Sequence, residues 1–216
     1  MKIKIDASSC KNVLAGTEKF NNGMLDYWYY QSLSFESGKV YGLISEYQQG
    51  CMYVSYLLGG NIEFEDGLAV FIDDKKIEEK DLKKISWNLE PLYESYKNKK
   101  VEKSINQALK YGYITENYEK IKNEFYFTEN RHNAKLRNLS GERWRASAAL
   151  GYALGKKIFF APYEPSIYYR NMKESNLFKV FDYLISNDCL IVLPVGSDEY
   201  LKEYVDECVY IKQNKS

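Results

Sequence analysis

The sequence is poor in the residues that build metal and acid–base centres. It has one histidine, His132, and four cysteines that form no C-x-x-C pair. Because structural zinc sites use closely spaced sets of Cys and His ligands, a zinc finger or ribbon is excluded, and no metal site is expected. His132 lies in the polar stretch FTENRHNAK, which favours a solvated position over a general base.

Charge of one sign and long apolar runs are lacking as well. Lys and Arg number 30, and Asp and Glu number 30, so the formal net charge is zero. This balance removes the general electrostatic reason to bind nucleic acid or an anionic membrane surface. No apolar run approaches the roughly 18 to 20 residues of a membrane helix, and the charged start MKIKIDASSCKN is unlike a signal peptide. We expect a cytoplasmic chain without a nucleic-acid partner.

What is present suffices for a folded core. Apolar residues make up 45% of the chain and aromatic residues 16%, with 21 tyrosines, which excludes an intrinsically disordered chain. The 216 residues, set against roughly 150 per domain, predict one domain with an inserted lobe.

Hydrophobic patterns predict strands alternating with helices, and therefore an α/β sheet. Strands are expected at residues 2–5, 27–35, 40–45, 68–72, 157–162, 189–194 and 208–211. Helices are expected after Gly50, within 100–127, after Ser140 as N-cap, over 177–184, and after Ser197 as N-cap. In the helix after Ser140, one apolar face is expected from Ala146, Ala149, Leu150, Ala153 and Leu154.

One segment carries a family resemblance. The stretch NLSGERWRASAALGYALGKKIFFAPYEP resembles the ATP-binding subunit of ABC transporters, in which a signature LSGGQ, a helix and a Walker B strand ending in Asp-Glu-Pro follow one another. The order of the family's other motifs holds over nearly the whole chain. The resemblance implies a P-loop NTPase-like core with a mostly parallel sheet, an antiparallel N-terminal β portion and an inserted helical lobe. It implies one domain over 1–216, with 1–85 and 156–216 as core and 86–155 as the helical lobe.

The phosphate-binding loop of this family keeps its place but not its chemistry. That loop, GxxxxGK[ST], surrounds phosphates with backbone N–H groups, a lysine and a hydroxyl that holds Mg²⁺. Here Ser45 stands at the first glycine, Gly50 is kept, Cys51 replaces the lysine and Met52 replaces the hydroxyl. Each lost charge-assisted contact costs about 1.5 to 3 kcal/mol, so tight MgATP binding by this chain is expected to fail.

At other positions too, this sequence lacks the residues that the family uses in its ATP site. Glu90 stands at the metal-contacting glutamine, Arg170 near the D-loop aspartate, and Val195 at the switch histidine. The Walker B aspartate falls on Tyr163, or on Pro162 and Tyr163 if a gap is allowed. Glu164 is kept, either as a catalytic carboxylate or as a strand-end residue retained by the fold.

The signature is the best preserved motif, over Leu139, Ser140, Gly141 and Glu142. In the family it acts on ATP held by a partner subunit. Ser140 and Gly141 could supply a hydroxyl and N–H donors to a γ-phosphate, or could form an N-cap and a tight turn without a ligand. Glu142 departs from the second glycine and adds a negative charge.

Two further features have open interpretations. The aromatic residues 27–30 include a candidate for adenine stacking, although core packing is the alternative. Cys51 is either a reactive thiol at a helix N-terminus or part of a filled loop. Tyr47, Tyr53 and Tyr163 are interpreted as occupants of a former nucleotide site.

The resemblance implies a degenerate, non-hydrolysing ABC subunit that binds no cofactor tightly itself. It would pair with a competent ATPase subunit, which holds ATP and Mg²⁺, and with transmembrane permease subunits at the inner face of the cell membrane. One alternative is a scaffold or regulatory interaction protein on the same fold. Another is an active ATPase with unusual ligands.

Overall fold

The fold is built on a parallel sheet of five strands. A computed structural model describes residues 1–10, 15–20, 23–90, 96, 98–139, 142–172 and 175–212. The parallel strands have the order β11-β5-β10-β9-β8. Their bounds are Lys39–Ile44 for β5, Ser86–Asn88 for β8, Ile158–Phe160 for β9, Leu190–Val195 for β10 and Glu207–Tyr210 for β11. Every residue of β10 is buried, as expected for a central strand covered on both faces.

A second, antiparallel sheet comes mainly from the N-terminal part. It contains β1 (Lys2–Asp6), β4 (Leu33–Glu36), β6 (Ala69–Ile72) and β7 (Lys75–Ile77), in the order β4-β1-β6-β7. In β1 exposed and buried residues alternate, so one face of this sheet packs against the core and the other faces solvent. The predicted parallel sheet, antiparallel N-terminal portion and helices are thus confirmed.

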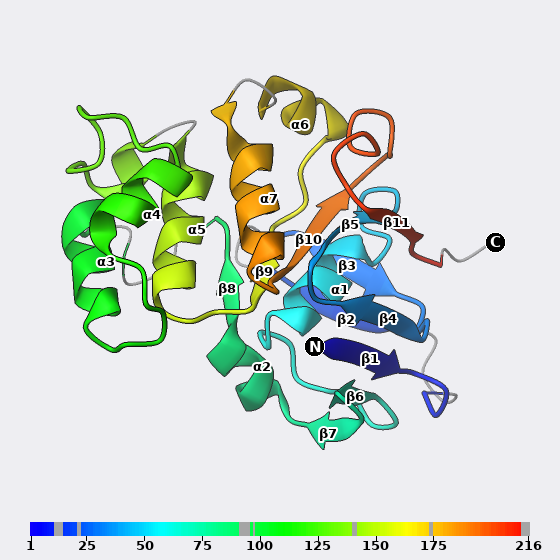
Figure 1. The fold of residues 1–216 in the computed structure, drawn as a ribbon. Helices are drawn as coiled ribbons and strands as arrows, with labels where there is room; N and C mark the ends of the chain where they lie inside the picture. The colour runs from blue at the N-terminus through cyan, green and yellow to red at the C-terminus, as the bar shows by residue number, and fades with distance from the viewer. Residues whose placement is uncertain are drawn as a thin grey trace.

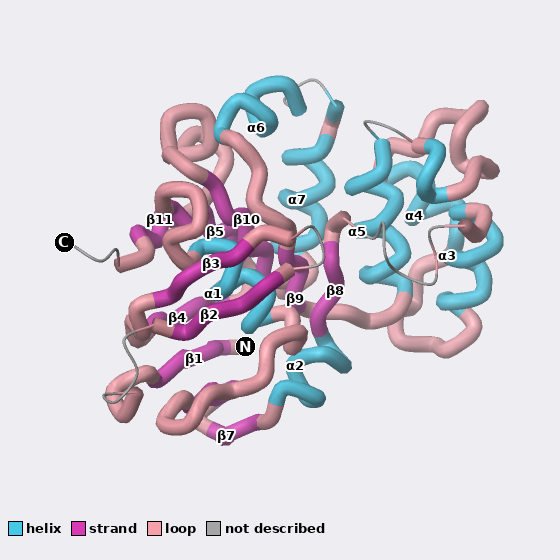
Figure 2. The backbone as a smooth tube through the Cα atoms, turned by 180° about the vertical axis from the view of Figure 1, so that it is seen from behind, coloured by secondary structure: helices cyan, strands magenta, loops and turns pink. Residues whose placement is uncertain are grey.

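Helix α1 (Cys51–Leu58) lies between the two sheets. Of its eight residues, seven are buried, because the helix packs against β3 (Leu25–Trp28) and against β5, β9 and β10 of the parallel sheet. Its close packing explains why the sequence is apolar all round the helix. The view in Figure 2 shows α1 behind β2 (Gly16–Lys19) and β3.

The other face of the parallel sheet is covered by two helices, α5 (Arg143–Ala153) and α7 (Leu177–Ser186). In α7 the four predicted apolar residues are all buried. In α5, the predicted inward residues Ala146, Ala149, Leu150 and Ala153 are buried, and so is every other residue from Trp144 to Ala153. The helix begins at Arg143 with Glu142 in the N-cap position, and the predicted N-cap, Ser140, lies outside the described residues.

Several further helices gather at one end of the molecule, beside α5 (Figure 1). They are α3 (Val101–Leu109), α4 (Tyr118–Glu124) and the short 3-10 helix η1 (Leu136–Asn138). Helix α2 (Glu79–Ile85) leads into β8, which is a strand of the parallel sheet. The division of the chain into lobes at 86 and 155 stays a prediction, with the first three residues of the proposed lobe lying in the sheet.

Two predicted elements differ in the structure. The predicted strand 27–35 is two strands, β3 (Leu25–Trp28) and β4, because Tyr30 has a φ of 43° and turns the chain between them. Strand β3 pairs with β2 (Gly16–Lys19) in a separate hairpin. The predicted helix after Ser197 is a series of turns held by bonds such as Leu201 N to the Asp198 carbonyl, 3.1 Å.

Candidate functional site

The candidate phosphate loop connects β5 to α1 and is closed by internal hydrogen bonds. The backbone N–H of Ser45 donates to the Val195 carbonyl at 3.2 Å, and that of Gln49 donates to the Glu46 carbonyl at 3.1 Å. The Ser45 hydroxyl accepts a bond from the N–H of Cys51 at 3.2 Å. The N–H groups of Ser45, Gln49 and Cys51 in this loop therefore already have acceptors within the chain.

A buried carboxylate caps the N-terminus of α1. Asp26, on β3, is fully buried. Its two oxygens accept bonds from the N–H groups of Gly50 at 2.8 Å and Tyr53 at 2.7 Å. Burial raises the pKa of Asp26, while these backbone bonds oppose the rise. A negative group at a helix N-terminus is the arrangement by which such loops hold phosphate, so Asp26 takes the role of an internal anion.

The backbone of β3 is pressed against the same loop. Gly50 has a φ of 95°, a conformation that favours glycine. A Cβ at this position would lie 3.0 Å from the Tyr27 carbonyl oxygen and 3.1 Å from the Trp28 Cα. In addition, the Tyr27 N–H donates to the Gln48 carbonyl at 3.2 Å. The β2–β3 hairpin therefore fills the space in front of α1.

The residues at the lysine and metal positions are apolar and enclosed. Cys51 is 1% exposed and Met52 is 3% exposed. Burial raises the pKa of the Cys51 thiol to about 12, so the thiol stays protonated at neutral pH. This favours the filled-loop interpretation over a reactive thiol. The aromatic neighbour Trp28 is also fully buried, against Tyr53, which favours core packing over adenine stacking.

Tyrosines lie where the Walker B aspartate is expected. The rings of Tyr163 and Tyr47 pack edge to face, with centroids 5.3 Å apart. The Tyr163 hydroxyl approaches the backbone of Gly196 so closely that a Cβ there would collide with it. Val195, at the switch position, is fully buried in β10. None of these side chains offers a carboxylate or an imidazole to a metal or a γ-phosphate.

Glu164 follows β9 and forms a single bridge with Val195 through its backbone N–H, which donates to the Pro194 carbonyl at 3.2 Å. Burial, together with the negative charge of Glu90, raises the pKa of the Glu164 carboxyl to about 7, against the opposing effect of Arg143. Glu164 is therefore a mixture of neutral and ionised forms at neutral pH, and it can exchange a proton there.

Glu90 ties the end of β8 to the start of α5. One oxygen, Oε2, accepts bonds from Arg143 Nη2 at 2.6 Å, Arg143 Nε at 2.9 Å and Trp144 Nε1 at 3.0 Å. The other oxygen, Oε1, is buried without a partner among the described residues. Because Arg143 and Trp144 follow the signature, the glutamine position is engaged by the signature helix rather than directed at a metal.

Of the signature residues, the structure describes only the first and the last, Leu139 and Glu142. Ser140 and Gly141 lie outside the described residues. Leu139 is buried. Glu142 donates its N–H to the Leu139 carbonyl at 2.9 Å, and its carboxylate pairs with Arg145 at 3.3 Å.

The D-loop position lies on a helix, α6 (Ser166–Met172). Arg170 is exposed there, and its guanidinium lies 5.5 Å from the centre of the Tyr200 ring. No carboxylate of the described residues replaces the expected D-loop aspartate at this position.

The structure also assigns a role that the sequence interpretation missed. Asp26 is the one acidic residue in the run LDYWYYQ, and an isolated charge on an otherwise apolar strand was the available signal. Its partners are Gly50 and Tyr53, more than twenty residues away, and no local pattern predicts that pairing.

Metal-ligand groups and membrane-spanning helices are both absent from the described ranges. These contain no group of three or more His, Cys, Asp or Glu side chains able to hold a metal ion. No helix in them is long and apolar enough to cross a membrane. Cys51 and Met52 offer neither the cation nor the metal-binding hydroxyl that the family's loop uses for MgATP. The backbone N–H groups of Gly50 and Cys51 already have acceptors.

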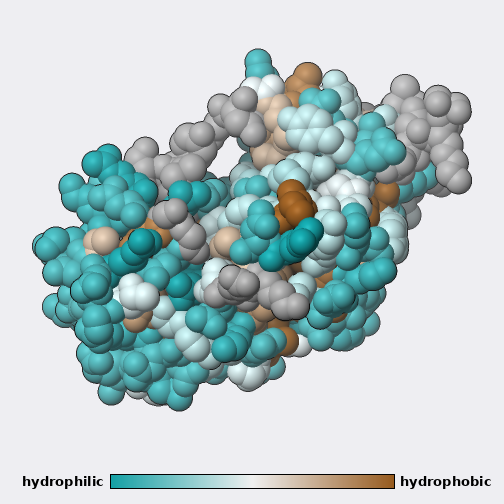
Figure 3. All heavy atoms as spheres, turned by 90° about the horizontal axis from the view of Figure 1, so that it is seen from above, coloured by the Kyte–Doolittle hydropathy of each residue, from teal (hydrophilic) through white to brown (hydrophobic). Residues whose placement is uncertain are grey.

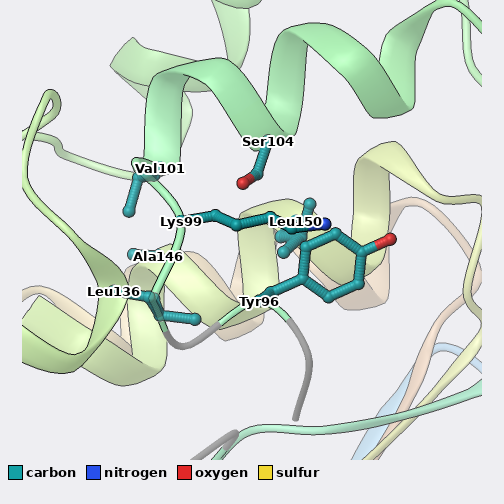
Figure 4. A pocket seen from close by; sticks show the side chains of 7 residues that line it. All are labelled: Tyr96, Lys99, Val101, Ser104, Leu136, Ala146 and Leu150. Atoms are coloured by element: carbon teal, nitrogen blue, oxygen red, sulfur yellow. The ribbon is translucent and has the colours of Figure 1, made fainter.

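A gap between α3 and α5 is a second candidate for a ligand site. Figure 4 shows the Lys99 side chain reaching across it toward Tyr96, whose ring centre lies 4.7 Å from the Lys99 ammonium. Val101, Leu136 and Leu150 line the rest. The gap has essentially no room for a water molecule, so we interpret it as lobe packing.

Comparison with known proteins identifies solved structures that share this fold. No protein-family model matches the sequence, and no curated protein matches it. Among solved structures, cbiO1 from Clostridium perfringens, part of the ABC transporter complex cbiONQ, has a TM-score of 0.65 at 12% identity over 97% of this chain and 84% of its own. A bacterial ABC transporter cassette solved as a dimer has a TM-score of 0.69 at 15% identity, over 97% and 94%. An ATP-binding cassette of an ABC transporter in its ADP conformation has a TM-score of 0.67 at 12% identity, over 98% and 87%. Along nearly its whole length, the chain has the fold of an ABC transporter ATP-binding cassette.

Proposed function

We propose that this chain is a non-hydrolysing ATP-binding-cassette subunit of an ABC transporter. One observation carries the proposal: the buried Asp26 carboxylate binds the N–H groups of Gly50 and Tyr53. A nucleotide phosphate at this helix N-terminus would meet a like charge at close range. It would also have to displace two charge-assisted hydrogen bonds, each contributing about 1.5 to 3 kcal/mol.

The proposal extends to partners. The chain pairs with a competent cassette subunit that holds ATP and Mg²⁺, and both dock on transmembrane permease subunits at the inner face of the membrane. Support comes from the fold itself and from two structural neighbours, of which one was solved as a dimer and another is part of a transporter complex. The signature of this chain, at Ser140 and Gly141, would cap the partner's ATP.

Affinity purification of the full chain from its native cells tests the pairing. The proposal expects a second cassette subunit and permease chains in the purified complex, with ATPase activity that depends on the second cassette. Ser140→Arg is expected to lower the ATPase activity of the complex while leaving its assembly intact. Unchanged ATPase activity in an assembled Ser140→Arg complex would contradict the proposal that this signature caps the partner's ATP.

A scaffold or regulatory interaction protein on the same fold is the second candidate. One observation favours it: among the described residues, five of the six exposed large apolar side chains are tyrosines, at 47, 111, 113, 126 and 210. Tyrosine is enriched in protein interfaces. However, the face in Figure 3 is mainly hydrophilic, with small separate apolar patches. Purification of the chain with soluble proteins alone, and with neither permease nor ATPase, would favour this candidate.

A further inference from the structure

A polar pocket lies beside α1, away from the phosphate loop. Thr17 and Glu18 of β2 line one wall, Tyr53 of α1 lines another, and residues 61–65, which follow α1, complete it. Its volume is about 550 Å³, within the roughly 300 to 1,000 Å³ of small-molecule sites.

All the charged side chains that line this pocket are negative. Glu18, Glu63 and Glu65 line it, and no lysine or arginine does. Within the described ranges, none of the three carboxylates has a hydrogen bond or an ion pair. Three uncompensated carboxylates around one concave surface raise the local concentration of cations.

Tyr53 provides an independent indication of a ligand. The residue is 1% exposed, yet it lines the pocket. Its hydroxyl has no hydrogen-bond partner among the described residues, and Gly16 leaves room for it, since a Cβ there would lie 2.8 Å from the hydroxyl oxygen. Burial raises the pKa of Tyr53, and the Glu65 and Glu18 carboxylates raise it further. The hydroxyl therefore stays protonated close to these carboxylates, with its oxygen free to accept a hydrogen bond.

The arrangement of the carboxylates selects among cations. In the described residues no three acidic, Cys or His side chains lie close enough together to hold one metal ion. The negative charge is instead spread along the pocket, next to the apolar side chains of Ile62 and Phe64. Spread charge with an apolar wall fits a cation whose charges are separated by methylene groups.

We propose that this pocket binds a small aliphatic polyamine, with its ammonium groups paired to Glu18, Glu63 and Glu65 and one N–H donating to the Tyr53 hydroxyl. This goes beyond the proposed transporter role. The fold would then have lost an anion site at the start of α1 and gained a cation site along its side.

Titration of the purified full chain with spermidine, by calorimetry at low ionic strength and without nucleotide, tests the proposal. Saturable one-to-one binding is expected. The combined Glu18→Gln, Glu63→Gln and Glu65→Gln variant should bind at least about tenfold more weakly, and Tyr53→Phe should lose roughly threefold to tenfold. Binding should also weaken as sodium chloride is added.

A matched control removes the same charge elsewhere. The combined Glu119→Gln, Glu199→Gln and Glu203→Gln variant changes three exposed carboxylates outside the pocket and should bind spermidine like the parent chain. Equal weakening in both triple variants would overturn the proposal, as would no saturable binding by the parent chain in the millimolar range. A thermal melt of each variant verifies folding. Since no ATP is present, failure here is distinct from failure of the transporter role.

Discussion

At the level of single residues, Asp26 determines the character of the candidate site. It supplies from within the chain the negative group that the start of α1 would otherwise bind from a ligand. Cys51 and Met52 then pack as ordinary core residues behind it. Under the proposed function, an internal carboxylate would therefore replace the phosphate, in addition to the change of individual ligand residues.

Replacing Asp26 should destabilise the chain strongly. Asp26→Ala leaves the N–H groups of Gly50 and Tyr53 buried without acceptors, so the free energy of unfolding should fall by about 3 kcal/mol. Asp26→Asn keeps one acceptor oxygen and should cost less. Urea denaturation measures both changes. Asp66→Ala, at an exposed position, is the control and should stay within about 0.5 kcal/mol of the parent. Equal effects of the Asp26→Ala and Asp66→Ala changes would refute the capping role.

Glu164 should make stability depend on pH. Its pKa is raised by burial from 4.5 to about 7, so between these values the unfolded chain ionises first and stability is lost as the pH rises. Glu164→Gln removes this loss. The difference in unfolding free energy between Glu164→Gln and the parent should therefore shift in favour of the variant from pH 4 to pH 8. This shift should be on the order of 1 kcal/mol, because the carboxyl is only partly shielded from water. Thermal melts at both pH values test this, and a difference that does not change with pH would contradict it.

At the level of elements, the link between β8 and α5 joins the parallel sheet to the helical end of the molecule. Glu90 is 12% exposed and Arg143 is 27% exposed, and Trp144 donates to the same carboxylate oxygen. Helix α5 is buried on all sides. This polar contact holds its start, and Arg145, Ser147 and Tyr152 make further side-chain hydrogen bonds along it.

A double-mutant cycle measures that link. Glu90→Ala and Arg143→Ala should show a coupling energy of about 1 to 3 kcal/mol in urea denaturation. The exposed pair Lys120–Glu124 on α4 is the control and should show about 0.3 to 0.5 kcal/mol. A Glu90–Arg143 coupling no larger than the control value would show that the pair does not hold the two elements together.

The elements that were predicted correctly are those whose secondary structure is determined by the hydrophobic pattern of their own residues. Strands β5 and β10 are continuous apolar runs, and α7 has a regular apolar spacing. The predicted strand 27–35 failed because the turn at Tyr30 comes from tertiary packing, and tyrosine favours strands by propensity. The polar residues after Ser197 form turns where a cap was expected, because capping residues also favour turns.

At the level of the whole molecule, the order of motifs along the chain was enough to predict the fold. The site was predictable only in what it lacks: the residues at the lysine, hydroxyl and histidine positions are visible in the sequence as Cys51, Met52 and Val195. The contact of Asp26 with the start of α1 was not predictable, because its partners Gly50 and Tyr53 lie more than twenty residues away in the sequence.

The most direct test of the central claim is a calorimetric titration of the purified full chain with MgATP. The account predicts no saturable binding in the millimolar range and no release of phosphate, because Asp26 occupies the helix N-terminus and Cys51 supplies no cation. Micromolar affinity accompanied by hydrolysis would contradict it.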